Sequence, residues 1–285
     1  MIDRAFQEKV AEWLRTEGYP LEMQVAAAFR KSGFQTIQSE FYDDPDTGKP
    51  REVDVHASMQ REIAATLVRV SFSVECKVSR DKPWVLFSTG DALLAEPATV
   101  AQRAATPLGQ RFLYGLAWQK AMQRLPLFAL PARPSYGLAQ AFGGADRAYE
   151  AVMSAAKAAA VSVREGANSH GLCEIVFPVV VLDGRLFEAF LAEDGSARTL
   201  ETASGTLIWR QQIVGMPHTI VAIVTLADLD SFLRQAVETA DALLEAADDL
   251  PAILSRADKT SRRIALKARR RLRLAGGQEE AASLD

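Results

Sequence analysis

The chain is poor in the residues that cross-link a fold or bind soft metals. Its 285 residues include only two cysteines, Cys76 and Cys173, which lie far apart and form no C-x-x-C pair. This excludes a disulfide framework and the cysteine spacing of a structural zinc site. Because Cys76 alternates with apolar residues, we expect it to act as a small hydrophobic side chain on a buried strand face.

The sequence also lacks any long apolar run. No segment approaches the roughly 20 apolar residues that a membrane-spanning helix needs. Residues 1–15 carry charges throughout, instead of the apolar centre of a signal peptide. We therefore expect a cytoplasmic protein without a membrane partner.

The chain as a whole has no excess of positive charge, because its formal net charge is −3. This average conceals a basic segment at residues 256–273, which contains nine Arg or Lys and one Asp. Its local net charge is +8, so the remaining residues carry −11. Ile264, Ala268 and Leu272 follow at helical spacing, which predicts a basic amphipathic helix. Contact with phosphates is one role for such a helix; a solvated face or a partner-binding surface is the alternative.

The pattern of apolar residues predicts an α/β protein. We expect one domain over residues 1–250, with a helical insertion at about 91–135, and a basic helical tail over 251–285. Pro178 lies within a continuous apolar run and indicates an edge position or a bulge, and Asp183-Gly184 is a hairpin signal. The patterns predict helices at 3–16, 20–32, 145–162 and 227–247, and strands at 34–42, 51–58, 68–77, 173–182, 185–191, 206–213 and 218–225.

Two of these strands have strict period-2 alternation. In residues 51–58 (REVDVHAS), Val53, Val55 and Ala57 point one way, and Glu52, Asp54 and His56 point the other. In residues 68–77 (VRVSFSVECK), the apolar residues Val68 to Cys76 alternate with polar residues that end in Glu75 and Lys77. We expect an antiparallel pair, packed on the core by its apolar side.

If these strands pair, Asp54, Glu75 and Lys77 converge on one patch of the sheet. Two adjacent carboxylates repel one another unless a cation lies between them, and Mg²⁺ prefers carboxylate, water and phosphate oxygens. Lys77 would add positive charge where a phosphoryl transition state accumulates negative charge, or would position or deprotonate the attacking water. The alternative is a set of solvent-face charges, in which Lys77 and Arg51 pair with the two carboxylates.

At this point the sequence resembles the PD-(D/E)XK phosphodiesterase superfamily of restriction-endonuclease-like nucleases and, more loosely, its Mrr-like branch. The matching text is Asp54 within REVDVHA and Glu75-Cys76-Lys77 within VSFSVECKVS, followed by Pro83-Trp84. The order of predicted elements also matches: a helix, three strands, a helix and another strand. The resemblance covers roughly residues 18–85 and 140–185, on either side of the insertion.

The resemblance implies a restriction-endonuclease-like mixed central sheet flanked by helices, with an αβββαβ core. It further implies that Asp54 and Glu75 are Mg²⁺ ligands, with Mn²⁺ as a substitute, and that Lys77 is the catalytic lysine. Glu22, in the first core helix, matches the position from which many members add a glutamate to the metal site. Two departures concern Val53, which replaces the proline of the motif, and the missing Gln-x-x-x-Tyr of the later helix. Gln140, Tyr149 and Lys157 are candidates for the polar contribution of that helix.

The function that follows is a Mg²⁺-dependent nuclease, which hydrolyses phosphodiester bonds by metal-activated water. The expected partner is nucleic acid, DNA before RNA, although no feature decides between the two; a homodimer or a partner protein stays open. The alternative is a catalytically inactive nuclease-fold module for binding or assembly, in which the insertion and the tail serve recognition. We expect His56 to be a satisfied sheet histidine and Trp84 a core or rim residue; a site role and base stacking are their alternatives.

Overall fold

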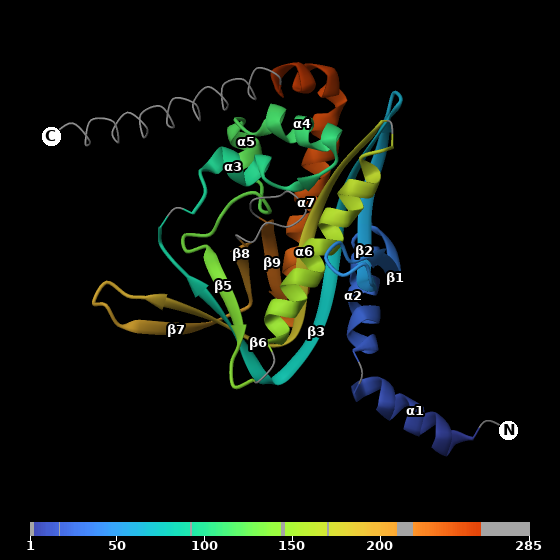
Figure 1. Cartoon of the computed structure of the whole chain (residues 1–285), viewed down its shortest axis with the longest axis vertical. Helices are drawn as coiled ribbons and strands as arrows, with labels where there is room; N and C mark the ends of the chain where they lie inside the picture. Colours follow the sequence, from blue (N-terminus) through green and yellow to red (C-terminus); the bar gives the residue numbers. More distant parts are fainter. Residues whose placement is uncertain are drawn as a thin grey trace.

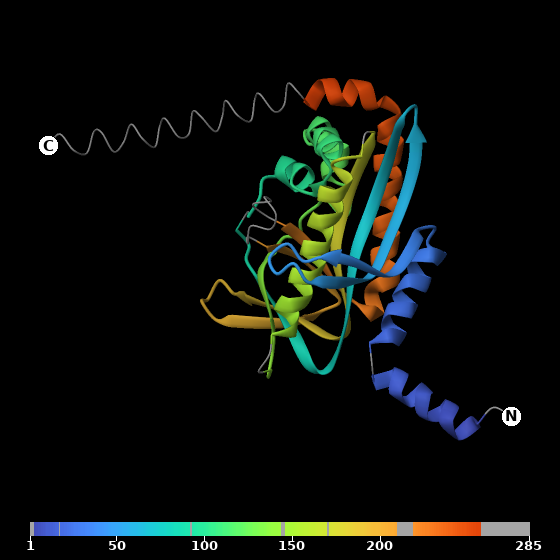
Figure 2. The same ribbon diagram turned by 45° about the vertical axis from the view of Figure 1, so that its right-hand side comes forward.

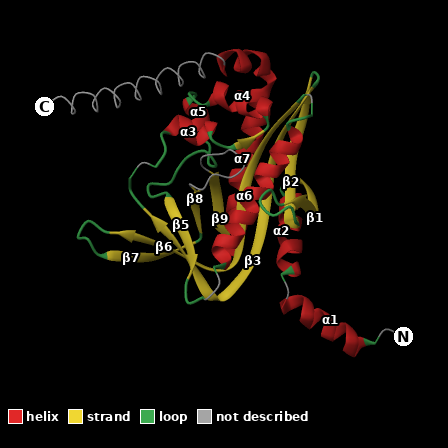
Figure 3. Ribbon diagram, viewed as in Figure 1, coloured by secondary structure: helices red, strands yellow, loops and turns green. Residues whose placement is uncertain are grey.

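The structure is a computed structural model that describes residues 3–16, 18–91, 93–143, 146–169, 171–209 and 219–257. It is a mixed α/β fold in which a large mixed sheet is flanked by helices (Figures 1 and 3). The helices are α1 (Arg4–Thr16), α2 (Tyr19–Lys31), α3 (Glu96–Ala101), α4 (Pro107–Leu116), α5 (Lys120–Gln123), α6 (Arg147–Gly166) and α7 (Leu229–Ala246). The strands are β1 (Gln35–Asp43), β2 (Pro50–Ile63), β3 (Thr66–Ser88), β4 (Ala104–Ala105), β5 (Ser135–Gln140), β6 (Leu172–Leu191), β7 (Ala197–Thr202), β8 (Ser204–Trp209) and β9 (Thr219–Thr225).

The long strands β3 and β6 form the centre of the sheet. β1, β2 and β3 are antiparallel neighbours, and the β2–β3 ladder runs from Ile63↔Thr66 to Val55↔Val74. On its other side β3 pairs with β6 in parallel, from Leu67↔Leu172 to Phe87↔Ala189. The expected antiparallel pair of residues 51–58 and 68–77 is therefore confirmed.

Both faces of the central strands are covered. On one face, Phe29 of α2 and Phe232 of α7 pack in the same core cluster as Phe72 and Phe177 of the sheet. The Ala-rich helix α6 covers the other face, because its alanines let it lie close to the strands (Figure 2). The alternation predicted that residues 68–77 pack on the core by their apolar side alone. The polar side is covered as well, by α6, and Ser71, Ser73 and Glu75 are buried. The continuous apolar run at 173–182 belongs to β6, and its residues are buried on both faces.

The prediction of a hairpin at Asp183-Gly184 is also wrong, because β6 runs straight through these residues. They pair with Val78 and Ser79 of β3. A Cβ on residue 184 would lie 2.4 Å from the Ser79 carbonyl oxygen, so glycine here allows two backbones to approach closely and does not form a turn.

Pro178 lies on a central strand, where a missing N–H is usually not tolerated. It falls between two pairings on the same side of β6. The β4 ladder ends at Val176, and the β9 ladder begins at Val179. Pro178 therefore occupies the gap between two partner strands. Of the predicted edge position or bulge, the edge is found only locally, on one side of a central strand, and the pairing with β3 continues through Pro178 without a bulge.

The predicted insertion forms the short helices α3, α4 and α5 and the two-residue strand β4. Its Phe112, Leu113 and Leu116 belong to the same core cluster as α2 and α7. The chain continues as a helix over residues 250–257, where Ile253 is buried in that cluster. Most of the predicted basic tail, residues 258–285, lies outside the described residues.

Helix α1 extends away from the sheet at the N-terminal end (Figures 1 and 2). Among the described residues, no helix combines the length and the apolar character needed to span a membrane.

Candidate active site

The candidate site lies where β2 and β3 separate. Their ladder ends at Val55↔Val74; beyond it β2 continues only with β1, while β3 continues with β6. Asp54 is the first β2 residue past the end of the ladder. Its Oδ2 accepts a hydrogen bond of 2.6 Å from the Cys76 backbone N–H. The Asp54 side chain thus takes the place of a backbone acceptor at the point where the sheet opens.

The alternation of β2 is broken at the same point. Val53 packs with Tyr42 and with Ala158 of α6, whereas Val55 belongs to the core cluster of α2 and α7. The expectation that Val53 and Val55 share a face is therefore wrong. The cause is the change of pairing partners, which frees the backbone at Asp54 from the β3 ladder.

Glu75 and Lys77 leave β3 on the same side, as predicted from their spacing. Lys77 Nζ lies 2.5 Å from Glu75 Oε1, and Glu75 is 6% exposed. Burial, reinforced by the charge of Asp54 and opposed by Lys77, raises the pKa of Glu75 to about 7. Burial also raises the pKa of Asp54, against the lowering effect of the Cys76 N–H. The site therefore holds carboxyl groups that are difficult to ionise without additional positive charge.

Lys77 responds in the opposite direction. Burial works to lower its pKa, but the charge and hydrogen bond of Glu75 and the charge of Asp54 outweigh this and raise it above the ordinary value. The side chain is therefore an ammonium at neutral pH. It is suited to stabilise negative charge and poorly suited to accept a proton from water.

Glu22 joins this group from the first turn of α2. Burial, together with the negative charges of Asp54 and Glu52, raises its pKa to about 7, and Lys77 opposes the rise. All four predicted residues therefore lie within electrostatic reach of one another. Glu52 is a further acidic neighbour that sequence reasoning left out; its position two residues before Asp54 on one strand was the available signal.

The carboxylates do not form a closed metal cage. Within the described residues, no group of three or more His, Cys, Asp or Glu side chains lies close enough to hold a metal ion. Asp54 is engaged with the Cys76 N–H and Glu75 with Lys77. The oxygen donors match the preference of a hard divalent cation, but three of them would have to draw together to ligate it.

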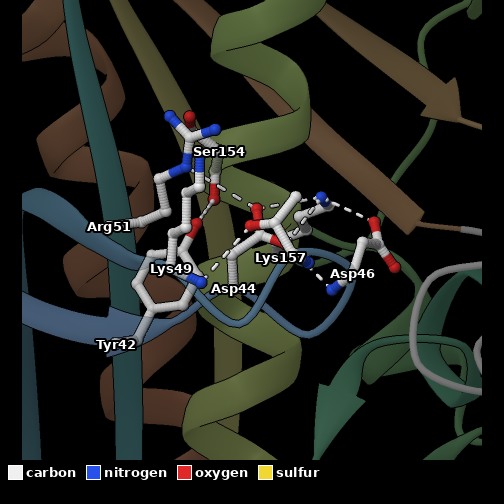
Figure 4. Close-up of polar contacts among 8 residues, drawn as sticks. Tyr42, Asp44, Asp46, Lys49, Arg51, Ser154 and Lys157 are labelled. Atoms are coloured by element: carbon white, nitrogen blue, oxygen red, sulfur yellow. Dashed lines mark hydrogen bonds and ion pairs between the residues drawn. The ribbon is translucent and has the colours of Figure 1, made fainter.

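A second polar cluster adjoins the site at the turn between β1 and β2 (Figure 4). Asp44 is buried there, and its Oδ1 accepts hydrogen bonds from the N–H groups of Asp46 and Thr47, which closes the turn. Lys157 of α6 places its Nζ 3.1 Å from Asp44 Oδ2 and 2.6 Å from Asp46 Oδ2. These two ion pairs hold the turn on α6. The turn lies beside the site, because burial and, second, the charge of Glu75 raise the pKa of the neighbouring Tyr42 to about 12.

The other two candidates for the later helix do not join the site. Gln140 lies on β5, before α6, and its Nε2 donates to Ser79 Oγ. Tyr149 lies on α6, where its ring packs against Trp209 at a centroid distance of 5.5 Å. The structure thus brings together Asp54, Glu75, Lys77 and Glu22, with Lys157 nearby in its own ion pairs.

Two further residues follow the expected structural roles. His56 Nδ1 lies 3.4 Å from Glu40 Oε2, so it is a sheet histidine with a partner. Trp84 has no exposed surface. It is a core residue and has no face available for stacking on a base.

Comparisons of the chain with protein-family models, with curated proteins and with solved structures found no match. The resemblance to PD-(D/E)XK nucleases therefore depends on the site residues and the order of the elements alone.

Proposed function

We propose that the chain is a divalent-metal-dependent phosphodiesterase that acts on nucleic acid. The observation that carries this proposal is the convergence of Asp54, Glu75, Lys77 and Glu22 at the opening between β2 and β3. Three carboxyl groups with raised pKa values, gathered around one ammonium, are typical of functional sites, because side chains on an ordinary surface would be solvated and apart.

The order of elements supports the restriction-endonuclease-like form of this proposal. Helix α2 precedes the antiparallel strands β1, β2 and β3; helix α6 follows, and β6 returns parallel to β3. This matches the αβββαβ order that the resemblance implies. The insertion, helices α1 and α7, strand β5 and strands β7 to β9 are additions around that core.

The residues fit a hard divalent cation in their chemistry. Asp54, Glu75 and Glu22 would hold Mg²⁺, or Mn²⁺ as a substitute, because their mutually unfavourable charges are what a cation would relieve. When bound, such an ion supplies Lewis-acid activation of a phosphoryl oxygen and of water.

The protein side chains have separable roles. The ammonium of Lys77 provides positive charge for the negatively charged transition state of phosphoryl transfer. The Cys76 N–H orients the Asp54 carboxylate, and Lys77 holds Glu75 in place. Glu22 contributes its carboxylate from a separate element, so that α2 and the sheet must pack correctly for the site to assemble.

Cleavage assays test this proposal. Plasmid DNA, single-stranded DNA and RNA would each be incubated with Mg²⁺ or Mn²⁺ and with wild-type, Asp54→Asn or Lys77→Met protein. We expect metal-dependent cleavage that falls about 100-fold or more in both variants. Glu40→Gln removes a carboxylate outside the site as a matched control and should retain activity. Equal activity in the wild type and both site variants would refute the site.

One observation favours the second candidate, an inactive nuclease-fold module for binding or assembly. Glu75 is tied to Lys77, and the described carboxylates do not group around a metal position. Calorimetric titration with Mn²⁺ separates the two functions. A phosphodiesterase binds the ion with a stoichiometry that Asp54→Asn abolishes; heats indistinguishable from dilution would support the module.

A further inference from the structure

Arg103 is a buried cation in the insertion, between α3 and β4. The residue is 4% exposed. Its guanidinium carbon lies 5.4 Å from the ring centroid of Phe128 and 5.8 Å from that of Phe177. Its Nη2 donates to the Leu127 carbonyl oxygen at 2.5 Å. Within the described part of the chain, Nε and Nη1 have no hydrogen-bond partner, and no carboxylate offsets the effect of burial on the guanidinium.

This arrangement has a high energetic cost for the fold. Burial lowers the pKa of Arg103 to about 9, so the side chain still carries its charge at neutral pH. The two aromatic rings offset part of the burial through cation–π contacts. They provide no acceptor for the remaining N–H groups, and a buried charge without a partner strongly destabilises a fold.

A cavity of about 180 Å³ lies beside this residue. At roughly 30 Å³ per water molecule, that volume suits a ligand of phosphate or small-carboxylate size. Its walls combine apolar side chains with a few hydroxyl and amide groups. They come from the insertion, β6, β8, β9 and α7, and include Arg103, Leu127, Phe177, Thr206, Ala222 and Gln235.

One acidic residue, Asp228, also lines the cavity. It forms no ion pair with Arg103 in the described part of the structure. It stands at the start of α7, where a carboxylate is favoured by the helix dipole. The position next to Arg103 therefore remains without a counter-charge from this wall.

We propose that this cavity binds a small oxyanion, through a carboxylate or phosphate group, with Arg103 as its anchor. A planar guanidinium offers parallel N–H donors that match such an oxyanion. Because Nε and Nη1 have almost no accessible surface, the guanidinium turns toward the cavity to donate to the ligand. The ligand would also link the insertion to β8, β9 and α7. This proposal is independent of the phosphodiesterase site, because the two share no residue.

Thermal unfolding with added anions tests the proposal. Inorganic phosphate and benzoate represent the two ligand chemistries, and sodium chloride at equal ionic strength controls for general salt effects. One or both oxyanions should raise the Tm of the wild type saturably, by about 3 °C or more at ten times the Kd. The oxyanion that acts identifies the ligand class.

Three variants locate the effect. Arg103→Met removes the anchor, and Ala222→Leu fills the cavity without touching the guanidinium; each should abolish the response. Arg133→Met changes another arginine stacked on an aromatic ring, at 4.0 Å from Phe190, and should keep it. The proposal is overturned if neither oxyanion stabilises the wild type beyond chloride, or if both Arg103→Met and Ala222→Leu respond like the wild type. If one of these variants does not fold, the other decides.

Discussion

At the scale of single residues, the site holds three acidic side chains and one basic side chain. Burial raises the pKa values of Glu22 and Glu75 to about 7, while Lys77 stays protonated. One ammonium faces three carboxyl groups that the fold holds together, so ionising all three is electrostatically unfavourable. A protein that kept this arrangement only for stability would gain by neutralising one of the acids.

Glu22→Gln therefore should stabilise the metal-free protein at high pH. Because the folded-state pKa of Glu22 lies above its ordinary value, the folded chain binds the proton more tightly than the unfolded chain. Stability is then lost as pH rises from about 4.5 to 7. The variant lacks this loss and should exceed the wild type by about 1 kcal/mol more at pH 8 than at pH 5, allowing for solvent screening.

Urea denaturation at the two pH values, with a chelator present, measures this difference. Glu62→Gln, which removes an exposed glutamate at the other end of β2, is the matched control. A pH-independent effect of Glu22→Gln would show that the charge of Glu22 is not coupled to the site.

At the scale of elements, the β1–β2 turn is held on α6 by Lys157. Asp44 is 5% exposed and Lys157 14% exposed at their side chains. Lys157→Met should leave Asp44 as a buried carboxylate whose remaining cation is the exposed Arg51, with Nε at 3.7 Å, and destabilise the fold by about 2 kcal/mol. Equilibrium unfolding measures the loss.

The double variant Asp44→Asn with Lys157→Met separates the ion pair from the packing of the lysine stem. It should recover part of the stability, because no unpaired charge remains. If the double variant is as unstable as the sum of the two single variants, the ion pair does not hold the turn.

Period-2 patterns predicted the elements that carry the site, but not the place where the pattern stops. Alternation from Val68 to Cys76 predicted the buried face of β3, and the same spacing placed Glu75 beside Lys77. The break at Asp54 could not be predicted in this way, because it arises where β2 exchanges one partner strand for another. Pro178 and Gly184 also could not be interpreted from the local sequence, because pairing with strands distant in the sequence determines the structure at both positions.

Strand β5 and the acidic neighbour Glu52 were missed for the same reason. Strand β5 has a weak pattern of its own and is defined by pairing with the far end of β3. Glu52 was not assigned to the site, although α2 brings Glu22 within its reach. Tertiary neighbours decide both cases, and no local sequence window contains them.

At the scale of the whole molecule, the basic segment predicted at 256–273 contrasts with an acidic remainder. Ile253 and Ala257 are each 2% exposed, so a truncated protein without the tail should keep all residues up to 257. Deletion of residues 258–285 should weaken nucleic-acid binding and flatten its dependence on salt, because phosphate contacts release counterions. Binding measured over a series of salt concentrations checks this, and an unchanged slope would assign the tail another role.

The most direct test of the central claim is a crystal structure of the protein soaked in Mn²⁺, with an anomalous difference map. A phosphodiesterase site at the β2–β3 opening predicts one peak bounded by Asp54 and Glu75, with Glu22 turned toward it and Lys77 released from Glu75. A map without a peak there at saturating Mn²⁺, with Glu75 still bound to Lys77, would contradict the proposed function.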